Sequence, residues 1–186
     1  MKIYCDTNCL LHNIRGKKCQ GELAALKHLA ERHELYGSRF VRHEVLDTPV
    51  RNASDEVLRD FLIVECDALK PVPKDEKLLG FHTNYDQFGG FVCCPMIADT
   101  HDDVLCEELK KRGLDPKDAQ HITQAVCNDC GVFLTRDVKS IIKPHGQWLE
   151  IRLHPLKFWS PSRLLEALEG GWPEAAKARA SKGALQ

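Results

Sequence analysis

The sequence predicts an α/β fold with a mainly parallel sheet that is covered by helices on both faces. Short apolar segments of strand type alternate along the chain with longer amphipathic segments of helical period, and this succession is typical of parallel sheets. The length of 186 residues fits one domain, and a hydrophobic content of 43% is sufficient to build a core.

The part of the chain up to residue 72 predicts three strands separated by helices. Leucine and alanine recur at helical spacing between residues 20 and 33. Serines at positions 38 and 54 are expected to cap two further helices, and Glu44 lies near the start of the first of these. The expected strands are residues 2–5, 34–36 and 69–72.

The middle of the chain begins with a segment that has no regular period. The stretch from Lys74 to Met96 contains aromatic residues and adjacent glycines, so we expect a long loop or an insertion there. A helical pattern returns at Thr100 and stops at Gly113. Asp115 and Pro116 then have the residue types of an N-cap and of a first helical position, and they predict a helix that ends near residue 130.

The last third of the chain predicts a strand, a short helix, a strand and a final helix. The apolar run 132–135 is the first strand, and a short helix after Asp137 should end before Pro144. Residues 148–153 alternate between apolar and polar types, as a strand does. Ser160 and Pro161 should begin a helix through residue 168, and the segment 170–186 is expected to be a flexible tail.

Four acidic residues occupy positions where strands end or helices begin. Asp6 and Asp137 follow apolar strands, whereas Glu44 and Asp118 belong to helices. In an open α/β sheet the ligand site forms outside the carboxyl ends of the strands, so the strand-end acids are expected to converge there. Because gathered carboxylates repel one another without a cation, the pattern predicts a site for Mg²⁺ or Mn²⁺ in a metal-dependent hydrolase.

The order of these motifs resembles the PIN-domain ribonucleases. The run DTN ends the first strand, an acid follows a serine at a helix start, DAQHI lies in a later helix, and TRD follows an apolar strand. The ending HPLKFWSPSRLLEAL is similar to the last strand and final helix of that family. The resemblance covers most of residues 1–169, and the least matched part is the stretch 72–112.

The resemblance implies a three-layer α/β/α sandwich that acts as a metal-dependent ribonuclease. It implies one nuclease domain over residues 1–169 with an insertion at about 72–112, dependence on Mg²⁺ or Mn²⁺, and cleavage of single-stranded or looped RNA. It also implies a relation to the toxins of toxin–antitoxin pairs, with an antitoxin or another regulatory protein, and a homodimer, among the expected partners.

Carried over residue by residue, the family's acidic quartet corresponds to Asp6, Glu44, Asp118 and Asp137. These four are the expected catalytic residues and metal ligands, because phosphodiester hydrolysis needs a deprotonated water and stabilisation of negative charge, which metal ions supply. Three neutral neighbours are expected to hold a carboxylate or a phosphate by hydrogen bonds. They are Thr7, Asn8 and Thr135.

The distribution of charge indicates where RNA would bind. The formal net charge is −1, but the middle of the chain is acidic and both ends are basic. A polyanion is attracted to local positive charge even when the whole chain is slightly acidic. The cations that flank the motifs, and that we expect to contact RNA, are Arg39, Arg42, Arg136 and Lys139.

The nine cysteines indicate a reducing compartment. Most lie inside apolar patterns, as reduced core thiols do, and no apolar run reaches the roughly 20 residues of a membrane span. The apolar start of the chain is interrupted at Asp6, so we expect a cytoplasmic protein without a signal peptide. Cys127 and Cys130 have the spacing of a zinc or redox pair, but packing is the favoured interpretation because no second pair follows.

Other interpretations of the same residues remain open. His121 lies one turn after Asp118 and either faces the site or fills the core, and Tyr85, Phe88 and Phe91 either stack on bases or anchor a loop. The main alternative to an enzyme is a catalytically weak PIN-like module that binds RNA or protein. A phosphatase with Asp6 as the nucleophile is disfavoured, because the second acid that such enzymes carry two residues on is replaced by Asn8.

Overall fold

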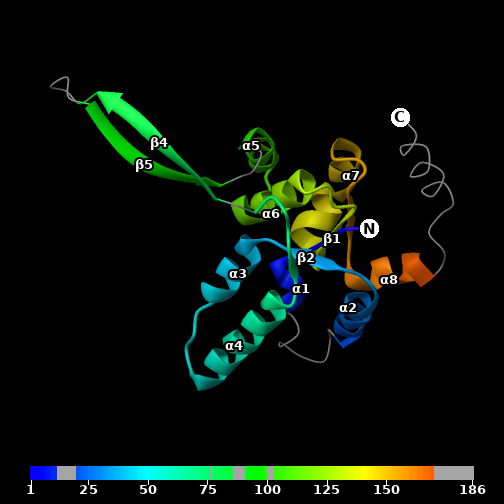
Figure 1. Cartoon of the computed structure of the whole chain (residues 1–186). Helices are drawn as coiled ribbons and strands as arrows, with labels where there is room; N and C mark the ends of the chain where they lie inside the picture. The colour runs from blue at the N-terminus through cyan, green and yellow to red at the C-terminus, as the bar shows by residue number, and fades with distance from the viewer. Residues whose placement is uncertain (12–19, 76, 86–90, 100–102, 170–186) are drawn as a thin grey trace.

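The architecture is a five-stranded sheet with helices on both faces. The computed structural model describes residues 1–11, 20–75, 77–85, 91–99 and 103–169. The sheet has the strand order β3-β2-β1-β6-β7, and every neighbouring pair is parallel (Figure 1). Its strands are β1 (Ile3–Cys5), β2 (Leu35–Gly37), β3 (Lys70–Pro71), β6 (Val132–Leu134) and β7 (Lys157–Trp159). The predicted parallel α/β sandwich is therefore confirmed.

The alternation of side chains along the strands creates two cores, one on each face of the sheet. Tyr4, Phe133 and Phe158 belong to one core, together with residues of three helices. These helices are α5 (Asp103–Lys111), α6 (Pro116–Cys127) and α7 (Lys143–Arg152). Because both faces are covered, β1 and β6 are buried along their whole length, which explains their uninterrupted apolar sequences.

The second core lies on the opposite face and includes Ile3, Cys5 and Leu134. The helices that contribute to it are α1 (Thr7–Leu11), α2 (Gln20–Arg32), α3 (Arg39–Leu46), α4 (Ala53–Asp67) and α8 (Pro161–Glu169). In Figure 1, α5, α6 and α7 lie on one side of the sheet, and α1, α2 and α4 lie on the other. The predicted helices in this layer are confirmed in position, although α4 begins after Asn52, whose side chain caps it, and not after Ser54.

Helix α6, which carries the predicted site residue Asp118, begins as the sequence predicts. Asp115 is the N-cap and accepts a hydrogen bond from the backbone N–H of Lys117, and Pro116 occupies the first helical position. Before it, Gly113 has a backbone φ of +92°, a conformation that residues with a Cβ rarely adopt, and this ends the preceding segment. The helix stops at Cys127, a turn earlier than predicted.

One prediction about the last third of the chain is confirmed and one is wrong. The short helix after Asp137 is a π-helix, η2 (Val138–Ile142), which ends before Pro144 as predicted, and Pro144 then lies in the first turn of α7. Residues 148–153, predicted as a strand, belong to α7 and its end. The strand that follows is β7, which lies in the HPLKFW run that resembles the last strand of PIN domains.

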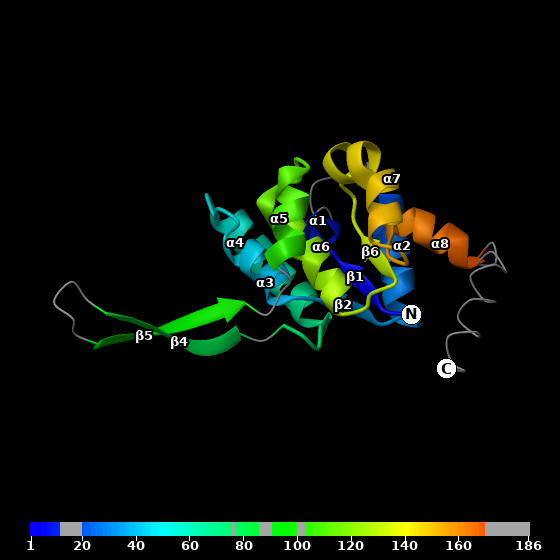
Figure 2. The ribbon, with the colours of Figure 1, turned by 90° about the horizontal axis from the view of Figure 1, so that it is seen from above.

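The middle of the chain forms a hairpin where a loop was expected. Strands β4 (Lys77–Tyr85) and β5 (Phe91–Asp99) pair in antiparallel register over nine residues each, so a loop is wrong for these strand residues, and the insertion remains a prediction. Both views show this hairpin extending away from the sheet and its helices (Figures 1 and 2). The tail 170–186 and the basic segment 12–19 lie outside the described residues.

Candidate active site

The candidate site forms where the two central strands end. Strands β1 and β6 are neighbours, with Cys5 opposite Leu134, and the backbone N–H of Asp6 donates to the carbonyl of Leu134 at 3.0 Å. In the sheet, β2 lies on one side of β1, and β6, which comes later in the chain, lies on the other side of β1. In open α/β sheets, ligands bind at the carboxyl ends of the strands where the strand order reverses in this way.

Asp6 is held in one orientation by Thr135, the residue that follows β6 in the chain. Its side chain is only 3% exposed, and its Oδ2 accepts a hydrogen bond of 2.8 Å from the hydroxyl of Thr135. Burial raises the pKa of Asp6, while the neighbouring His121 and the Thr135 hydroxyl oppose the rise. A buried carboxylate with this surrounding favours a cation beside it.

Asn8 connects the start of α1 with the loop after β6. Its Nδ2 donates to the Thr135 hydroxyl at 2.9 Å, and its Oδ1 accepts from the backbone N–H of Arg136 at 2.9 Å. The backbone N–H of Asp137 also donates to the Thr135 hydroxyl at 3.1 Å. Thr135 is therefore the centre of a network that fixes Asp6 and the backbone before Asp137.

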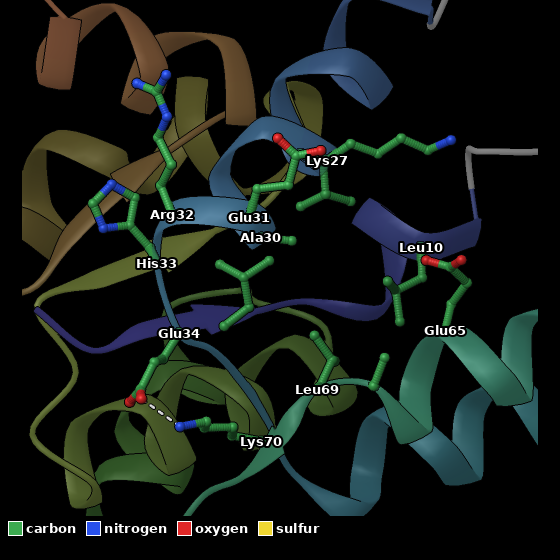
Figure 3. Close-up of a pocket in the computed structure, with 13 residues that line it drawn as sticks. Leu10, Lys27, Ala30, Glu31, Arg32, His33, Glu34, Glu65, Leu69 and Lys70 are labelled. Atoms are coloured by element: carbon green, nitrogen blue, oxygen red, sulfur yellow. Dashed lines mark hydrogen bonds and ion pairs between the residues drawn. The ribbon is translucent and has the colours of Figure 1, made fainter.

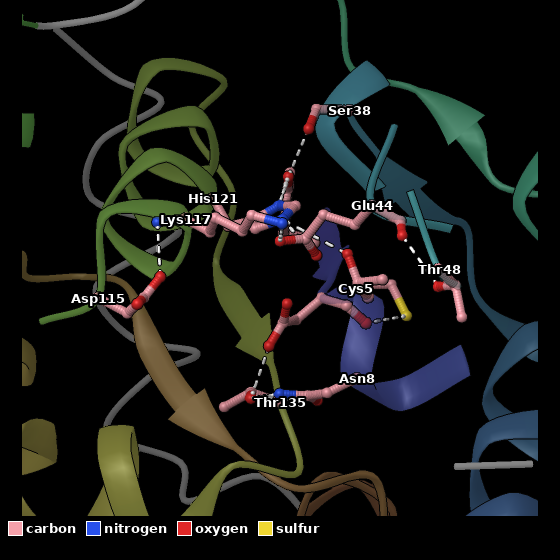
Figure 4. A network of polar contacts seen from close by, with 12 residues as sticks. Cys5, Asn8, Ser38, Glu44, Thr48, Asp115, Lys117, His121 and Thr135 are labelled. Atoms are coloured by element: carbon pink, nitrogen blue, oxygen red, sulfur yellow. Dashed lines mark hydrogen bonds and ion pairs between the residues drawn. The ribbon is translucent and has the colours of Figure 1, made fainter. Parts of the chain in front are cut away.

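A second network joins Glu44 to the core through His121 (Figure 4). The Nε2 atom of His121 lies 3.2 Å from Oε2 of Glu44, and its Nδ1 lies 2.8 Å from the hydroxyl of Tyr4. The Tyr4 hydroxyl in turn lies 2.7 Å from that of Ser38. The Ser38 side chain does not cap α3, although Ser38 occupies the N-cap position, because its hydroxyl is engaged with Tyr4.

The His121–Glu44 contact has the character of a partly buried ion pair. Burial alone would lower the pKa of His121, but the hydrogen bond with Glu44 and the charges of Asp6 and Glu44 raise it above its ordinary value. Burial would raise the pKa of Glu44, yet the hydrogen bond and charge of His121 hold it below its ordinary value. Glu44 lies late in α3 and not near its start, so the sequence prediction of its position was wrong.

The side chains of Asp6, Glu44 and His121 can direct ligand atoms to one point. One ligand atom from each lies within 4.8 Å of the others. Both ring nitrogens of His121 already have partners, because Nε2 contacts Glu44 and lies 3.4 Å from the Thr7 hydroxyl, while Nδ1 contacts Tyr4. The oxygen atoms of the carboxylates are therefore the more suitable ligands, and they fit the hard cations Mg²⁺ and Mn²⁺.

Asp118 belongs to the same electrostatic cluster. It lies one turn before His121 on α6, and burial, followed by the charges of Asp6, Asp115 and Asp137, raises its pKa to about 7. The adjacent acid Asp115 has a different position, because it is exposed and its carboxylate caps the helix. The structure thus separates the two acids of this helix start.

Asp137 caps the π-helix that follows β6. Its Oδ1 accepts hydrogen bonds from the backbone N–H groups of Lys139 and Ser140, at 3.1 Å and 2.8 Å. It also raises the pKa of Asp118, so its charge acts on the cluster. Capping and membership of the acidic cluster are thus combined in one side chain.

The four predicted RNA-binding cations differ in their surroundings. Lys139 is exposed and Arg136 is partly buried, and both adjoin Asp137 in the chain. The side chain of Arg39 donates to the backbone carbonyl of Asp75 at 2.7 Å, and Nε of Arg42 lies 3.3 Å from Asp67. Arg39 and Arg42 therefore hold parts of the domain together, whereas Lys139 faces solvent beside the acids.

The cysteine pair does not join a metal-ligand group in the described part of the chain. There, the group with suitable geometry is the acidic one with His121, and Cys127 and Cys130 are free thiols. Burial raises the pKa of Cys130 to about 12, which disfavours the thiolate that zinc or redox chemistry needs. Cys93 and Cys94, and the aromatic side chains of Tyr85, Phe88 and Phe91, lie outside the described side chains.

A groove of about 370 Å³ lies elsewhere on the domain (Figure 3). Its apolar floor includes Leu26, Leu35 and Leu69, and its rim carries the ion pair between Glu34 and Lys70. None of the predicted site residues lines this groove. The acidic cluster, whose polar groups converge at the strand ends, is therefore the better candidate for catalysis.

Comparison with known proteins identifies the fold. No protein-family model matches the sequence, and no curated protein does. One solved structure with a matching fold is VapBC2 from Rickettsia felis bound to a DNA fragment from its promoter. The superposition covers 86% of this chain and 98% of that chain, with a TM-score of 0.51 and 16% sequence identity. The likeness shows the fold, and it agrees with the α/β/α sandwich that the sequence predicts. No helix among the described residues is long and apolar enough to cross a membrane.

The raised pKa of Asp118 predicts that the free energy of unfolding of the metal-free protein depends on pH. A carboxyl whose pKa is raised on folding binds its proton more tightly in the folded state, so its contribution to stability falls as pH rises from about 4 to about 7. Replacing Asp118 by Asn should remove this cost. Urea unfolding in chelator should show the variant gaining stability relative to the wild type, and gaining more at about pH 8 than at about pH 5.

The matched control for this variant is Asp115→Ala. Loss of that cap should lower the free energy of unfolding by about 0.5–2 kcal/mol, because the backbone N–H of Lys117 loses its partner. An Asp118→Asn variant whose stability relative to the wild type is the same at both pH values would contradict the placement of Asp118 in the acidic cluster.

Proposed function

We propose that this protein is a divalent-metal-dependent endoribonuclease that hydrolyses phosphodiester bonds of single-stranded or looped RNA. The observation that carries the proposal is the gathering of carboxylates at the carboxyl ends of β1 and β6. Asp6 and Glu44 bring ligand atoms within 4.8 Å of each other, and Asp6 and Asp137 both raise the pKa of Asp118. Such a cluster repels RNA phosphates unless cations occupy it.

This repulsion favours an enzyme over a module that only binds RNA. A binding surface has no need of negative charge where phosphates must dock, and nucleic-acid affinity comes mainly from Lys and Arg contacts. A hydrolytic site needs these acids, because metal ions held by carboxylates activate the attacking water and stabilise the charge on the phosphate and the leaving oxygen. The likeness to a VapBC2 chain supports the same choice at the level of the fold.

The ligands that we propose for Mg²⁺ or Mn²⁺ are the carboxylates of the four acids. Asp6 and Glu44 have ligand atoms that lie close to each other, and Asp118 and Asp137 add negative charge nearby. Thr135 keeps Asp6 in one orientation, and Asn8 keeps Thr135 in place. His121 holds Glu44 through its Nε2 and is itself held by Tyr4, so its proposed role is to position Glu44.

The RNA strand is proposed to approach over the loop that follows β6. Lys139 is exposed there, and Arg136 precedes the capping acid Asp137. Thr7 lies at the start of α1, where its hydroxyl lies 3.4 Å from Nε2 of His121. Cations beside the acids would draw the phosphate backbone toward the site without reading its sequence.

We also propose an antitoxin-type partner and a cytoplasmic location for this protein. The similar chain belongs to a VapBC2 complex, which supports an antitoxin-type partner for this protein too. The described cysteines are free thiols, and most of them are buried, as expected in a reducing compartment.

The direct test is cleavage of a mixed RNA pool by the pure protein in Mn²⁺ or Mg²⁺, with chelator as the blank. Wild-type protein should cleave only with the metal, and Asp6→Asn should lose activity by at least about 100-fold, because it removes the charge while keeping the side-chain shape. Asp115→Ala should remain active at a temperature where it is folded. RNA that binds but is never cleaved would leave the PIN-like binding module as the function.

A second test concerns the path of the RNA strand. Lys139→Ala should weaken RNA binding for all sequences and reduce the slope of log K against log salt by about 0.7, the value for one lost phosphate contact on single-stranded RNA. The control is Lys111→Ala, which removes another exposed lysine, from α5. Equal losses for the two variants, measured by fluorescence anisotropy at several salt concentrations, would exclude the β6 loop as the RNA path.

A further inference from the structure

A pocket at the junction of α3 and α4, here called the α3–α4 pocket, is lined by two arginines. It has a volume of about 430 Å³ and lies between the segment that connects the helices and the N-terminal part of α4. Arg51 precedes the N-cap of α4 and Arg59 lies within the helix, while Leu58 and Leu62 form the apolar part of the wall. Ligand pockets of this size are mostly apolar, with a few polar groups that orient the ligand. The two arginines are the candidates for that role here.

The side chain of Arg59 has no acceptor for its hydrogen bonds in the described part of the chain. Its Nε is buried and unpaired, and no ion pair within those residues involves its guanidinium group. By contrast, Arg39 donates to a backbone carbonyl, and Arg42 and Arg152 pair with carboxylates. A buried donor without an acceptor costs free energy unless a bound ligand or water supplies one. Arg59 is therefore suited to bind an anion.

The acid that could pair with Arg59 within α4 is engaged elsewhere. Asp55 lies four residues before Arg59, a spacing at which acidic and basic side chains on a helix form ion pairs. Its Oδ2 instead accepts a hydrogen bond of 3.0 Å from the backbone N–H of Arg51. This contact fixes the backbone of Arg51 at the start of α4 and leaves Arg59 without this counter-ion. The side chain of Arg51 is exposed and has no ion pair with any described residue.

The α3–α4 pocket adjoins the candidate active site. Thr48 lines the pocket, and its hydroxyl donates to the backbone carbonyl of Glu44 at 3.0 Å (Figure 4). In the sheet, β1 lies between β2, which leads into α3, and β6, which leads into the loop with Lys139. Asp6 follows β1, so the acids lie between Lys139 on one side and the two arginines of the pocket on the other.

We propose that Arg51 and Arg59 bind a phosphate group of the RNA strand at a position away from the cleaved bond. A guanidinium group presents its N–H donors in a planar fork that matches a phosphate, and such charge-assisted hydrogen bonds are stronger than neutral ones. An acidic segment of a partner protein offers carboxylates to the same fork, and RNA is favoured because the pocket adjoins the acids that are proposed to cleave it. This inference rests on the proposed nuclease function and adds a second place where the strand is held.

The test is the binding of a labelled single-stranded RNA, measured by fluorescence anisotropy in chelator at several salt concentrations. Arg59→Ala should weaken binding about tenfold, as expected when a hydrogen bond to a charged group is lost. Arg59→Ala and Arg51→Ala should each reduce the slope of log K against log salt by about 0.7. The matched control is Arg32→Ala, which removes an exposed arginine of α2 outside the pocket and should bind RNA as the wild type does.

Two further measurements separate a phosphate contact from a structural role of Arg59. Arg59→Lys keeps the charge but loses the planar fork, so the salt slope should stay at the wild-type value while the affinity falls between those of the wild type and Arg59→Ala. In RNA cleavage with Mn²⁺, Arg59→Ala should raise KM and leave kcat unchanged, because the contact is away from the cleaved bond. A fall in kcat at unchanged KM would show that the change acts through α3 on Glu44, and it would contradict the proposal.

The remaining outcomes assign the pocket to another ligand or separate this inference from the nuclease. Equal RNA binding by the wild type and Arg59→Ala would overturn the proposal. If inorganic phosphate then raised the melting temperature of the wild type but not of Arg59→Ala, the pocket would be a site for free phosphate, and if it raised neither, an acidic protein segment would be the ligand.

The two proposals fail in different ways. RNA that binds through Arg51 and Arg59 but is never cleaved would refute the nuclease and leave this inference in place. Metal-dependent cleavage that neither Arg51→Ala nor Arg59→Ala alters would refute this inference alone.

Discussion

The parallel pairing of β1 with β6 is the constraint on which the rest of the site depends. It places Asp6 beside Thr135, because Cys5 lies opposite Leu134 and each strand ends at that residue, so that Asp6 and Thr135 come next in the chain. The neighbouring helix α6 then brings Asp118 and His121 over the same strand ends. Because these acids come from distant parts of the chain, their mutual repulsion exists only in the folded state, and the fold must oppose it with hydrogen bonds or cations.

Two contacts oppose this repulsion between the acids, a hydrogen bond from a neutral group and an ion pair with a histidine. Neutral and cationic groups hold individual acids, since Thr135 donates to Asp6 and His121 pairs with Glu44. These contacts fix geometry, but they leave the pKa of Asp118 raised to about 7. The remaining unfavourable charge is what a divalent cation would remove, so the same feature that costs stability in the metal-free protein would provide affinity for metal.

The sequence predicted the sheet and the start of α6 well because their signals are local. Buried strands such as β1 and β6 are continuous apolar runs. The start of α6 is indicated by two adjacent residues, because Asp115 is the N-cap and Pro116 is the first residue of the helix. The segment 148–153 was mistaken for a strand because the end of α7, a helix that begins at Lys143, shows an alternation of apolar and polar residues over six positions. The role of His121 depends on its contacts with Tyr4 and Glu44, which are distant in the sequence. The pairing of β4 with β5 depends on their register. The spacing of residues along the chain indicates neither.

The central claim is that the gathered carboxylates form a metal site, and the unfolding of metal-free protein titrated with Mn²⁺ tests it most directly. A ligand that binds only the folded state should add about 2.7 kcal/mol to the free energy of unfolding at a hundred times its dissociation constant. We expect this gain in the wild type and its loss in Asp6→Asn. A free energy of unfolding that does not change with Mn²⁺, or that rises equally in both proteins, would contradict the account.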